Sequence, residues 1–161
     1  MIVILHNIRS LHNVGSIFRT ADAVGAEKIY LCGITPKPID VFGKPRQQLT
    51  KVSLGAEKYV EWEYCKSTSR LIDKLKRDSY KIFSVEQSKK SIPYYKIPKS
   101  LILNHKSVFI LGNEVNGLSQ SILNKSDKIM EIPMKGKKES LNVGVAFGIV
   151  AYHFLNKSAT K

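Results

Sequence analysis

The sequence predicts an α/β fold in which a mostly parallel sheet is covered by helices on both faces. Strand and helix patterns alternate along the 161 residues. The strand segments are continuous apolar runs, such as Ile2 to Leu5, which is typical of parallel strands buried on both faces. Turns rich in glycine and asparagine follow several of these strands. We expect one domain over residues 1–156 and a loose tail over residues 157–161.

The N-terminal third opens with a β-α-β pattern. Ile2 to Leu5 predicts a strand, Asn13 to Val24 a helix closed by Gly25, and Lys28 to Cys32 a second strand. Residues 33–45 contain three prolines and therefore predict a loop.

The alternation continues in the middle of the chain. Tyr59 to Tyr64 predicts a strand, Ser67 to Asp78 an amphipathic helix capped by Ser67 or Thr68, and Lys81 to Val85 another strand. Glu86 to His105 carries four lysines around two prolines and two tyrosines, which predicts an exposed irregular segment.

The last third is expected to contain, in order, a strand over Val108 to Leu111, a turn over Gly112 to Gly117, a short helix from about Ser119, a strand over Lys128 to Ile132, a loop over Pro133 to Leu141 and a helix from about Asn142 to Leu155. The final helix is apolar on nearly all sides. Such a helix is buried, often in an interface.

The composition excludes several classes of protein. With 43% hydrophobic and 24% charged residues, the chain is not disordered. It has neither an apolar stretch of about 20 residues nor a signal-peptide pattern, so we expect a cytosolic protein without a membrane partner. Cys32 and Cys65 lack CxxC spacing and nearby paired histidines, which argues against a metal site and a disulfide framework.

The charge indicates the kind of partner. Lys and Arg number 26 against 13 Asp and Glu, a formal net charge of +13, which would attract a polyanion such as nucleic acid. Charge alone does not separate nucleic acid from an anionic membrane. The lysines of residues 86–105 are a candidate nucleic-acid-facing surface.

Three polar corners follow predicted strands, where ligands bind in parallel sheets. They are Asn7 to Ser10 running into Asn13 to Arg19, Leu111 to Ser119, and Ile132 to Gly144. None has the GxGxxG or GxxxxGK[ST] spacing of nucleotide-binding loops, so a dehydrogenase-like domain is the weaker alternative.

Together and in this order, the three corners resemble the three motifs of the SpoU family of RNA methyltransferases, within the SPOUT superfamily. The resemblance extends over Tyr30 to Pro36 and Leu54 to Lys58 between them. It implies an α/β knot fold with a C-terminal deep trefoil knot over about residues 108–155. It also implies a homodimer whose active sites are completed across the interface, and methyl transfer from S-adenosylmethionine to a ribose 2′-hydroxyl of RNA without a metal.

The resemblance leaves the RNA open between tRNA and ribosomal RNA. We favour tRNA because the chain has no room for an added RNA-binding domain, as in compact relatives that act on tRNA. Large-subunit ribosomal RNA is the alternative. A non-catalytic RNA-binding protein of the same fold is a third possibility, which the loss of motif residues would signal, but Arg19, Glu114, Ser140 and Asn142 are all present.

Five residues match the family's catalytic positions: Arg19, Asn13, Glu114, Ser140 and Asn142. A guanidinium stays protonated, so we assign Arg19 to orienting the hydroxyl and stabilising an emerging alkoxide rather than to proton abstraction. From the residues alone, simpler roles remain open. Arg19 would then be a solvated helix residue, Asn13, Ser140 and Asn142 helix caps, and Glu114 a surface carboxylate in a turn.

The resemblance also implies the binding residues. Those for S-adenosylmethionine are Val85, Leu111, Gly112, Ile132, Met134, Ser140 and Leu141, acting largely through backbone groups and apolar contacts. Those for RNA are Arg9, Arg19, Lys135, Lys137 and Lys138. A solvated charge run is the alternative for the three lysines.

Overall fold

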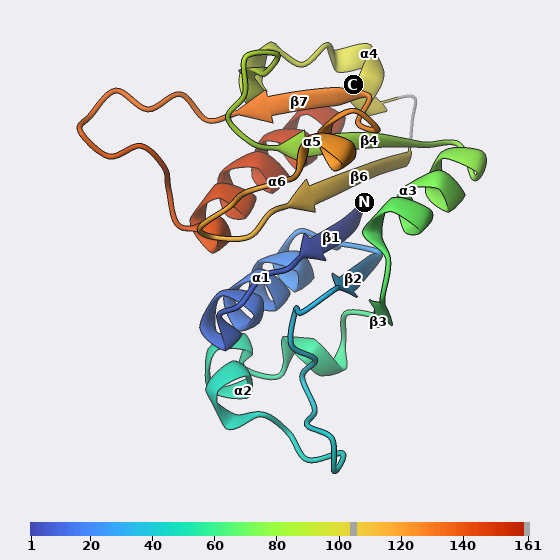
Figure 1. The fold of residues 1–161 in the computed structure, drawn as a ribbon, viewed down its shortest axis with the longest axis vertical. Helices are drawn as coiled ribbons and strands as arrows, with labels where there is room; N and C mark the ends of the chain where they lie inside the picture. The colour runs from blue at the N-terminus through green and yellow to red at the C-terminus, as the bar shows by residue number, and fades with distance from the viewer. Residues whose placement is uncertain (104–105, 160–161) are drawn as a thin grey trace.

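The computed structural model describes residues 1–103 and 106–159. Its strands form one sheet in the order β3-β2-β1-β6-β4-β7-β5, and every pairing is parallel (Figure 1). The strands are β1 (Ile2–His6), β2 (Lys28–Cys32), β3 (Trp62–Cys65), β4 (Tyr80–Val85), β5 (Ile92–Pro93), β6 (Lys106–Leu111) and β7 (Lys128–Glu131).

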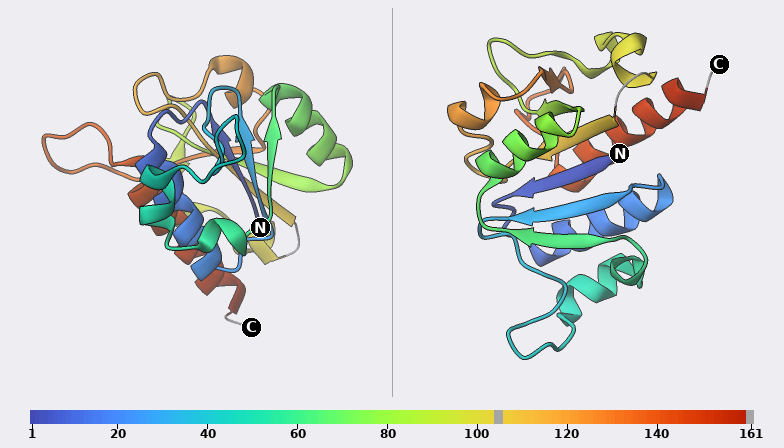
Figure 2. Two further views of the ribbon diagram at one scale, coloured as in Figure 1. Left: turned by 90° about the horizontal axis from the view of Figure 1, so that it is seen from below. Right: turned by 90° about the vertical axis from the view of Figure 1, so that its right-hand side faces the viewer.

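Helices cover both faces of this sheet. They are α1 (Leu11–Ala23), α2 (Gln47–Ser53), α3 (Thr68–Arg77), α4 (Lys99–Leu103), α5 (Gln120–Leu123) and α6 (Val143–Ala159), with 3-10 turns η1 (Ala56–Lys58) and η2 (Tyr94–Lys96). Helices α1 and α6 lie on one face, and α3 and α5 lie on the other (Figure 2). The predicted fold class is confirmed, whereas the trefoil knot stays a prediction.

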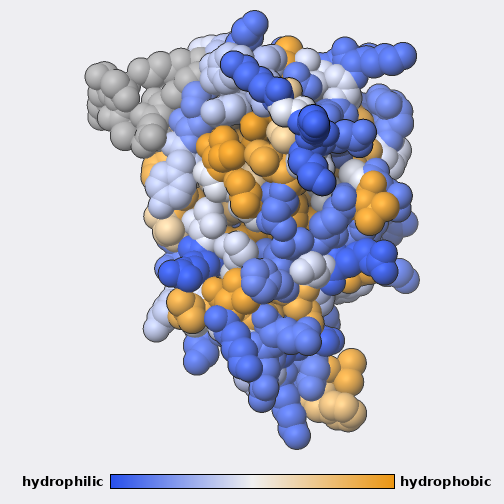
Figure 3. Space-filling model, turned by 90° about the vertical axis from the view of Figure 1, so that its left-hand side faces the viewer, coloured by the Kyte–Doolittle hydropathy of each residue, from blue (hydrophilic) through white to orange (hydrophobic). Residues whose placement is uncertain are grey.

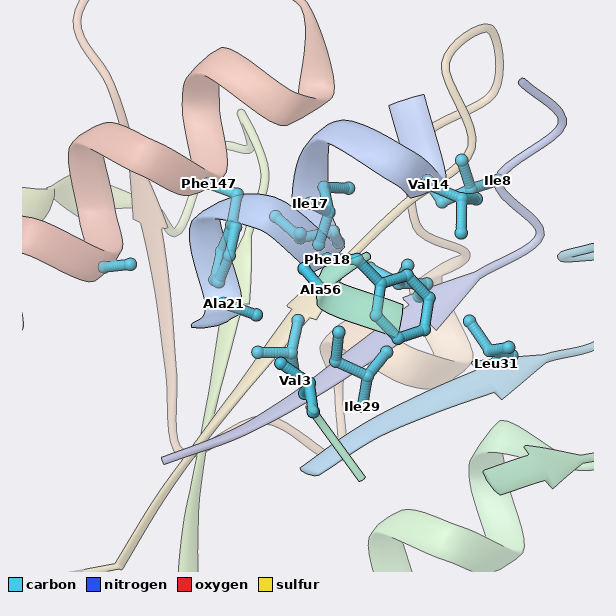
Figure 4. Close-up of a cluster of buried hydrophobic side chains, with 14 of the residues drawn as sticks. Val3, Ile8, Val14, Ile17, Phe18, Ala21, Ile29, Leu31, Ala56 and Phe147 are labelled. Atoms are coloured by element: carbon cyan, nitrogen blue, oxygen red, sulfur yellow. The ribbon is translucent and has the colours of Figure 1, made fainter. Parts of the chain in front are cut away.

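The apolar run of β1 has a direct structural reason. Successive side chains of a strand point to opposite faces. Val3 and Leu5 pack with α1 and with Phe147 of α6 (Figure 4), while Ile2 and Ile4 pack with α3 and α5 on the other face. Because both faces are buried, every position of the strand is apolar.

Helix α1 begins two residues earlier than predicted. Ser10 is its N-cap, and the Ser10 hydroxyl oxygen accepts a hydrogen bond from the Asn13 backbone N–H at 3.2 Å. Asn13 is therefore buried in the first turn of the helix rather than capping it. Gly25, with φ of +65°, follows the helix end as predicted.

The prediction of an exposed irregular segment over residues 86–105 was wrong in part. The segment contains β5, η2 and α4, and it buries Ile97 and Ile102, which are 1% and 7% exposed. A two-residue strand and single-turn helices are too short to give a periodic apolar pattern. The predicted His105 end of the segment lies outside the described residues. Helix α2, with seven residues, and turn η1, with three, were also not predicted, because such short elements give little apolar periodicity.

The C-terminal boundary also differs. Helix α6 continues through residues 157–159 of the predicted tail, and residues 160 and 161 lie outside the described part of the chain. Within the described residues, no helix is both long and apolar enough to cross a membrane.

Candidate functional site

The strand order brings the three polar corners to one edge of the sheet. Strand β6 lies between β1 and β4, and β7 lies beside β4. The registers pair Leu5 with Leu111, Leu111 with Val85, and Val85 with Met130, so these four strands end at the same level. The loops that follow β1, β6 and β7 are therefore neighbours, as the strand-end argument predicted.

A cavity of about 520 Å³ opens at this edge. The predicted cofactor residues all line it: Val85, Leu111, Gly112, Ile132, Met134, Ser140 and Leu141. So do four of the five predicted catalytic residues, namely Asn13, Glu114, Ser140 and Asn142. Figure 3 looks onto this edge and shows an apolar patch surrounded by hydrophilic residues.

A directed chain of hydrogen bonds joins the three corners across the cavity wall. The Asn13 side-chain amide donates to the Glu114 carboxylate at 3.0 Å, and the Asn142 amide donates to the Asn13 side-chain oxygen at 2.9 Å. The Asn142 oxygen in turn accepts from the Gly144 backbone N–H at 2.9 Å, at the start of α6. Each amide has one acceptor and one donor side, so this chain fixes the orientation of both asparagines.

Glu114 is held by the loop after β1 and by the first turn of α1. Its carboxylate accepts from the backbone N–H groups of Arg9 at 3.1 Å and Ser10 at 3.2 Å, besides the Asn13 amide. Partial burial raises the pKa of the carboxyl group, but these hydrogen bonds lower it by more, so the pKa lies below its ordinary value. Glu114 is thus an ionised anchor between two corners.

The cavity contains a further carboxylate that the sequence reasoning missed. Glu86 follows β4, and its carboxylate accepts from the Leu118 backbone N–H at 2.8 Å and the Gln87 N–H at 2.9 Å. Gly117, with φ of +61°, lies against this carboxylate, where a Cβ would clash. Glu86 stands directly after Val85 at a strand end, so the rule that located the other corners would have found it.

Glu131, at the end of β7, is a third carboxylate on the cavity wall and was also missed. One of its oxygens accepts from the Ser91 hydroxyl at 2.6 Å. Together with Glu86 and Glu114 it gives the cavity an acidic wall in a chain of net charge +13. The cavity therefore suits a ligand that carries positive charge.

The predicted RNA-binding residues lie around the cavity rather than in it. Arg9 lines a neighbouring groove with His12 of α1 and Lys51 of α2. Lys135, Lys137 and Lys138 are exposed on the loop of residues 133–142, which projects from the sheet edge (Figure 1).

Arg19 is the one predicted catalytic residue that the structure does not bring to this cavity. It is exposed on α1 and is not among the lining residues. It lies six positions after Asn13 in the helix, which corresponds to about 9 Å along the axis. Within residues 1–103 and 106–159, no group of three His, Cys, Asp or Glu side chains is arranged to hold a metal ion.

A comparison with protein families gives a match that covers most of the chain. The family described as "SpoU rRNA Methylase family" matches residues 1–152. Among curated proteins, a tRNA (guanosine(18)-2′-O)-methyltransferase from Aquifex aeolicus is 30% identical over 152 residues, 94% of this chain and 67% of that protein.

Two further similarities agree with this match. A putative TrmH family tRNA/rRNA methyltransferase from Staphylococcus haemolyticus is 31% identical over 156 residues, which are 97% of this chain. The chain spans only 58% of that relative. The solved structure of an AdoMet-bound rRNA methyltransferase from Sinorhizobium meliloti aligns with a TM-score of 0.84 at 25% identity, covering 96% of this chain and 55% of that one.

Proposed function

The chain belongs to the SpoU rRNA methylase family, and on that premise we propose that it transfers a methyl group from S-adenosylmethionine to a ribose 2′-hydroxyl of RNA. The observation that carries the proposal is the cavity at the carboxyl edge of the sheet. It unites all the residues predicted to bind the cofactor with the hydrogen-bonded Glu114, Asn13 and Asn142.

The cavity fits this cofactor in size, lining and charge. Its volume of about 520 Å³ lies within the range of small-molecule sites. Val85, Leu111 and Ile132 offer an apolar wall to an adenine ring, and the strand ends offer backbone groups. The carboxylates of Glu86 and Glu131 suit a ligand that carries a sulfonium and an ammonium group. When bound, the cofactor supplies an electrophilic methyl group.

The protein's own residues then position the ribose and handle charge. Asn13 and Asn142, oriented by Glu114, hold the cavity wall at the point where the three corners meet. Ser140 lies on the same wall and offers a hydroxyl to the ribose. We assign Arg19 to orienting the hydroxyl or its phosphate and to stabilising the oxygen as it loses its proton.

Because Arg19 does not line the cavity of its own chain, we propose that the protein works as a homodimer in which Arg19 serves the partner's cavity. Apolar side chains exposed on α6 support this assembly, since Val145 and Tyr152 are 53% and 46% exposed. The same proposal includes three further expectations: a C-terminal knot, catalysis without a metal, and a cytosolic location.

For the RNA substrate we favour tRNA, with ribosomal RNA as the alternative. The Aquifex relative is named for tRNA, and the Sinorhizobium structure is named for rRNA. The exposed Arg9, Lys135, Lys137 and Lys138 around the cavity supply phosphate contacts to either RNA.

The test is a methyl-transfer assay with purified protein, radiolabelled S-adenosylmethionine, and total tRNA or total rRNA in separate reactions. We expect label in tRNA, and cofactor binding by calorimetry. An absence of transfer to both pools together with an absence of cofactor binding would refute the proposal. Label in rRNA alone would assign the alternative substrate.

The role of Arg19 has its own variant. Arg19→Ala should lower transfer about a hundredfold or more, the scale seen when one transition-state donor is removed. It should leave cofactor binding unchanged, because the side chain is exposed and away from the cavity. Lys74→Ala, which removes an exposed charge from α3, is the control. Undiminished transfer by Arg19→Ala contradicts the assignment.

A further inference from the structure

Residues 36–46 form a compact hairpin that projects from the molecule between β2 and α2 (Figure 1). Ile39 and Pro45 pair as an antiparallel bridge. The Asp40 backbone N–H donates to the Lys44 carbonyl at 2.8 Å, and the Arg46 N–H donates to the Pro38 carbonyl at 2.8 Å. The segment predicted only as a loop is therefore an ordered arm, which we call the 36–46 hairpin.

The tip of the 36–46 hairpin is organised by one carboxylate. The same oxygen of Asp40 accepts from the backbone N–H groups of Phe42 and Lys44, each at 2.9 Å. Gly43, with φ of +77°, allows the tight reversal. The Asp40 carboxylate is thus hydrogen-bonded within the turn.

This fixed tip presents apolar side chains to solvent. Val41 is 87% exposed and Phe42 is 83% exposed, and Figure 3 shows the apolar tip against a hydrophilic projection. Single exposed apolar residues are common, but two adjacent ones at the end of an ordered arm mark a contact site.

The surroundings of the tip are basic. Lys37 and Lys44 are exposed and Arg46 is half-buried, so the hairpin carries three cations around the one engaged carboxylate. The Lys37 ammonium lies 5.0 Å from the centre of the Tyr64 ring. The exposed Phe42 ring thus lies among cations. This arrangement is typical of proteins that bind single-stranded nucleic acid, where a base stacks on the ring and the phosphates contact the charges.

The base of the 36–46 hairpin is tied to the catalytic edge. The Thr35 hydroxyl donates to the Leu5 carbonyl at 2.8 Å and accepts from the Ile8 N–H at 3.0 Å, and the Ile34 N–H donates to Asn7. The loop after β1 continues into Arg9, which lines a groove together with Lys51 of α2, the helix that follows the hairpin. The hairpin base is therefore connected to the loop that carries Arg9, and that loop borders the cavity through the hydrogen bonds of Arg9 and Ser10 to Glu114.

We propose that the 36–46 hairpin is an RNA-binding arm, in which Phe42 stacks on an unpaired base of the substrate while Lys37, Lys44 and Arg46 contact the adjacent phosphates. This inference rests on the proposed function for the identity of the ligand. It adds a selection element outside the cofactor cavity, and it makes unpaired nucleotides near the modified ribose a requirement for tight binding.

The test compares Phe42→Ala, Phe42→Trp and the wild type in binding to a fluorescein-labelled single-stranded oligouridylate and to a blunt RNA duplex of the same length. Tyr59→Ala is the matched control, because Tyr59 is 80% exposed outside the hairpin. We expect Phe42→Ala to weaken binding of the single strand about tenfold, the loss typical of one stacked base. Binding of the duplex should be unchanged, and Phe42→Trp should restore the affinity.

Phe42→Trp also gives a signature of stacking. Trp62 is the single native tryptophan and is half-buried, so emission added by the variant reports on the tip. Unlabelled oligouridylate should quench that added emission. The proposal is overturned if Phe42→Ala and wild type bind the single strand with equal affinity, or if neither binds it. It is also overturned if Phe42→Ala weakens binding of the single strand and of the duplex equally.

A contact between two copies of the chain is the other use of such a tip. Sedimentation velocity of wild type and Phe42→Ala distinguishes it, and a smaller sedimentation coefficient for the variant alone would overturn the RNA proposal.

Methyl transfer is measured in parallel. If the protein transfers methyl groups but its RNA binding does not depend on Phe42, the RNA-binding role of the hairpin is refuted and the proposed function is kept. If RNA binding depends on Phe42 but no methyl group is transferred to either RNA pool, the RNA-binding role of the hairpin is kept and the proposed function is refuted.

Discussion

Two loops at the same edge of the sheet are built in opposite ways. The loop of residues 112–118, the clamped loop, is tied by Glu86 at one end and by Glu114 to the loop after β1. The loop of residues 133–142, the projecting loop, extends away from the sheet and carries exposed lysines (Figure 1). The difference teaches that the clamped loop is a fixed part of the cavity wall, whereas the projecting loop joins that wall only near its two ends, at Met134 and at Ser140 to Asn142.

Glycine shows the same contrast. A Cβ at Gly112 would lie 2.6 Å from the Gly117 carbonyl carbon and 2.8 Å from the Leu118 nitrogen, both backbone atoms. At Gly136, no heavy atom of the described residues would lie within 4 Å of an added Cβ. Glycine is required for close packing in the clamped loop, and it is not required for space in the projecting loop.

The largest expected effect tests this contrast directly. Gly112→Ala should push apart two backbone segments that line the cavity, at a cost of about 1–3 kcal/mol in unfolding free energy. Cofactor affinity should fall more than about tenfold, because the cavity wall moves. Gly136→Ala should change stability by less than about 0.5 kcal/mol. Urea unfolding and calorimetry measure both, and equal losses in the two variants would abolish the distinction.

Glu114→Gln tests the anchor of the clamped loop. The glutamine amide would face N–H donors that now meet a carboxylate oxygen, so we expect a loss of about 1–3 kcal/mol in stability. Asn13 should lose its fixed orientation, and turnover should fall. Unfolding curves and methyl transfer are the measurements. Unchanged stability with unchanged turnover would show that the anchor is dispensable.

The same variant has a defined pH dependence. The folded-state pKa of Glu114 lies below its ordinary value of 4.5, so its stabilising contribution is present above about that pH. The contribution is lost as pH falls through the lower folded-state pKa. The stability difference between wild type and Glu114→Gln should therefore be largest near neutral pH and shrink in acid. A difference that grows in acid would contradict the assignment.

The smallest effect on stability is expected in the projecting loop. The double variant Lys137→Ala with Lys138→Ala should unfold within about 0.5 kcal/mol of wild type, since both side chains are exposed. It should weaken RNA binding, and the slope of log affinity against log salt should become shallower by about one to two. Lys74→Ala on α3 is the control of equal charge type. An unchanged salt slope would mean that the loop lysines are only solvated.

Much of the site was predictable because strand ends obey a simple rule. The corners after β1, β6 and β7 were found from apolar runs followed by polar turns, and the structure places them together around one cavity. Glu86 escaped because the segment after β4 looked irregular, although it follows Val85 at the same edge. The capping roles considered for Asn13 and Asn142 have different outcomes. Ser10 caps α1, whereas Asn142 caps α6 and also bonds Asn13.

The sequence by itself determined the fold class, the family and the residues of the three corners, because apolar periodicity and motif spacing are local properties of the chain. Only the tertiary structure decided that Glu114, Asn13 and Asn142 form one directed hydrogen-bond chain, and that Arg19 lies outside the cavity. It also decided that residues 36–46 are an ordered arm. Contacts between residues more than a hundred positions apart depend on the strand order, which no local pattern encodes.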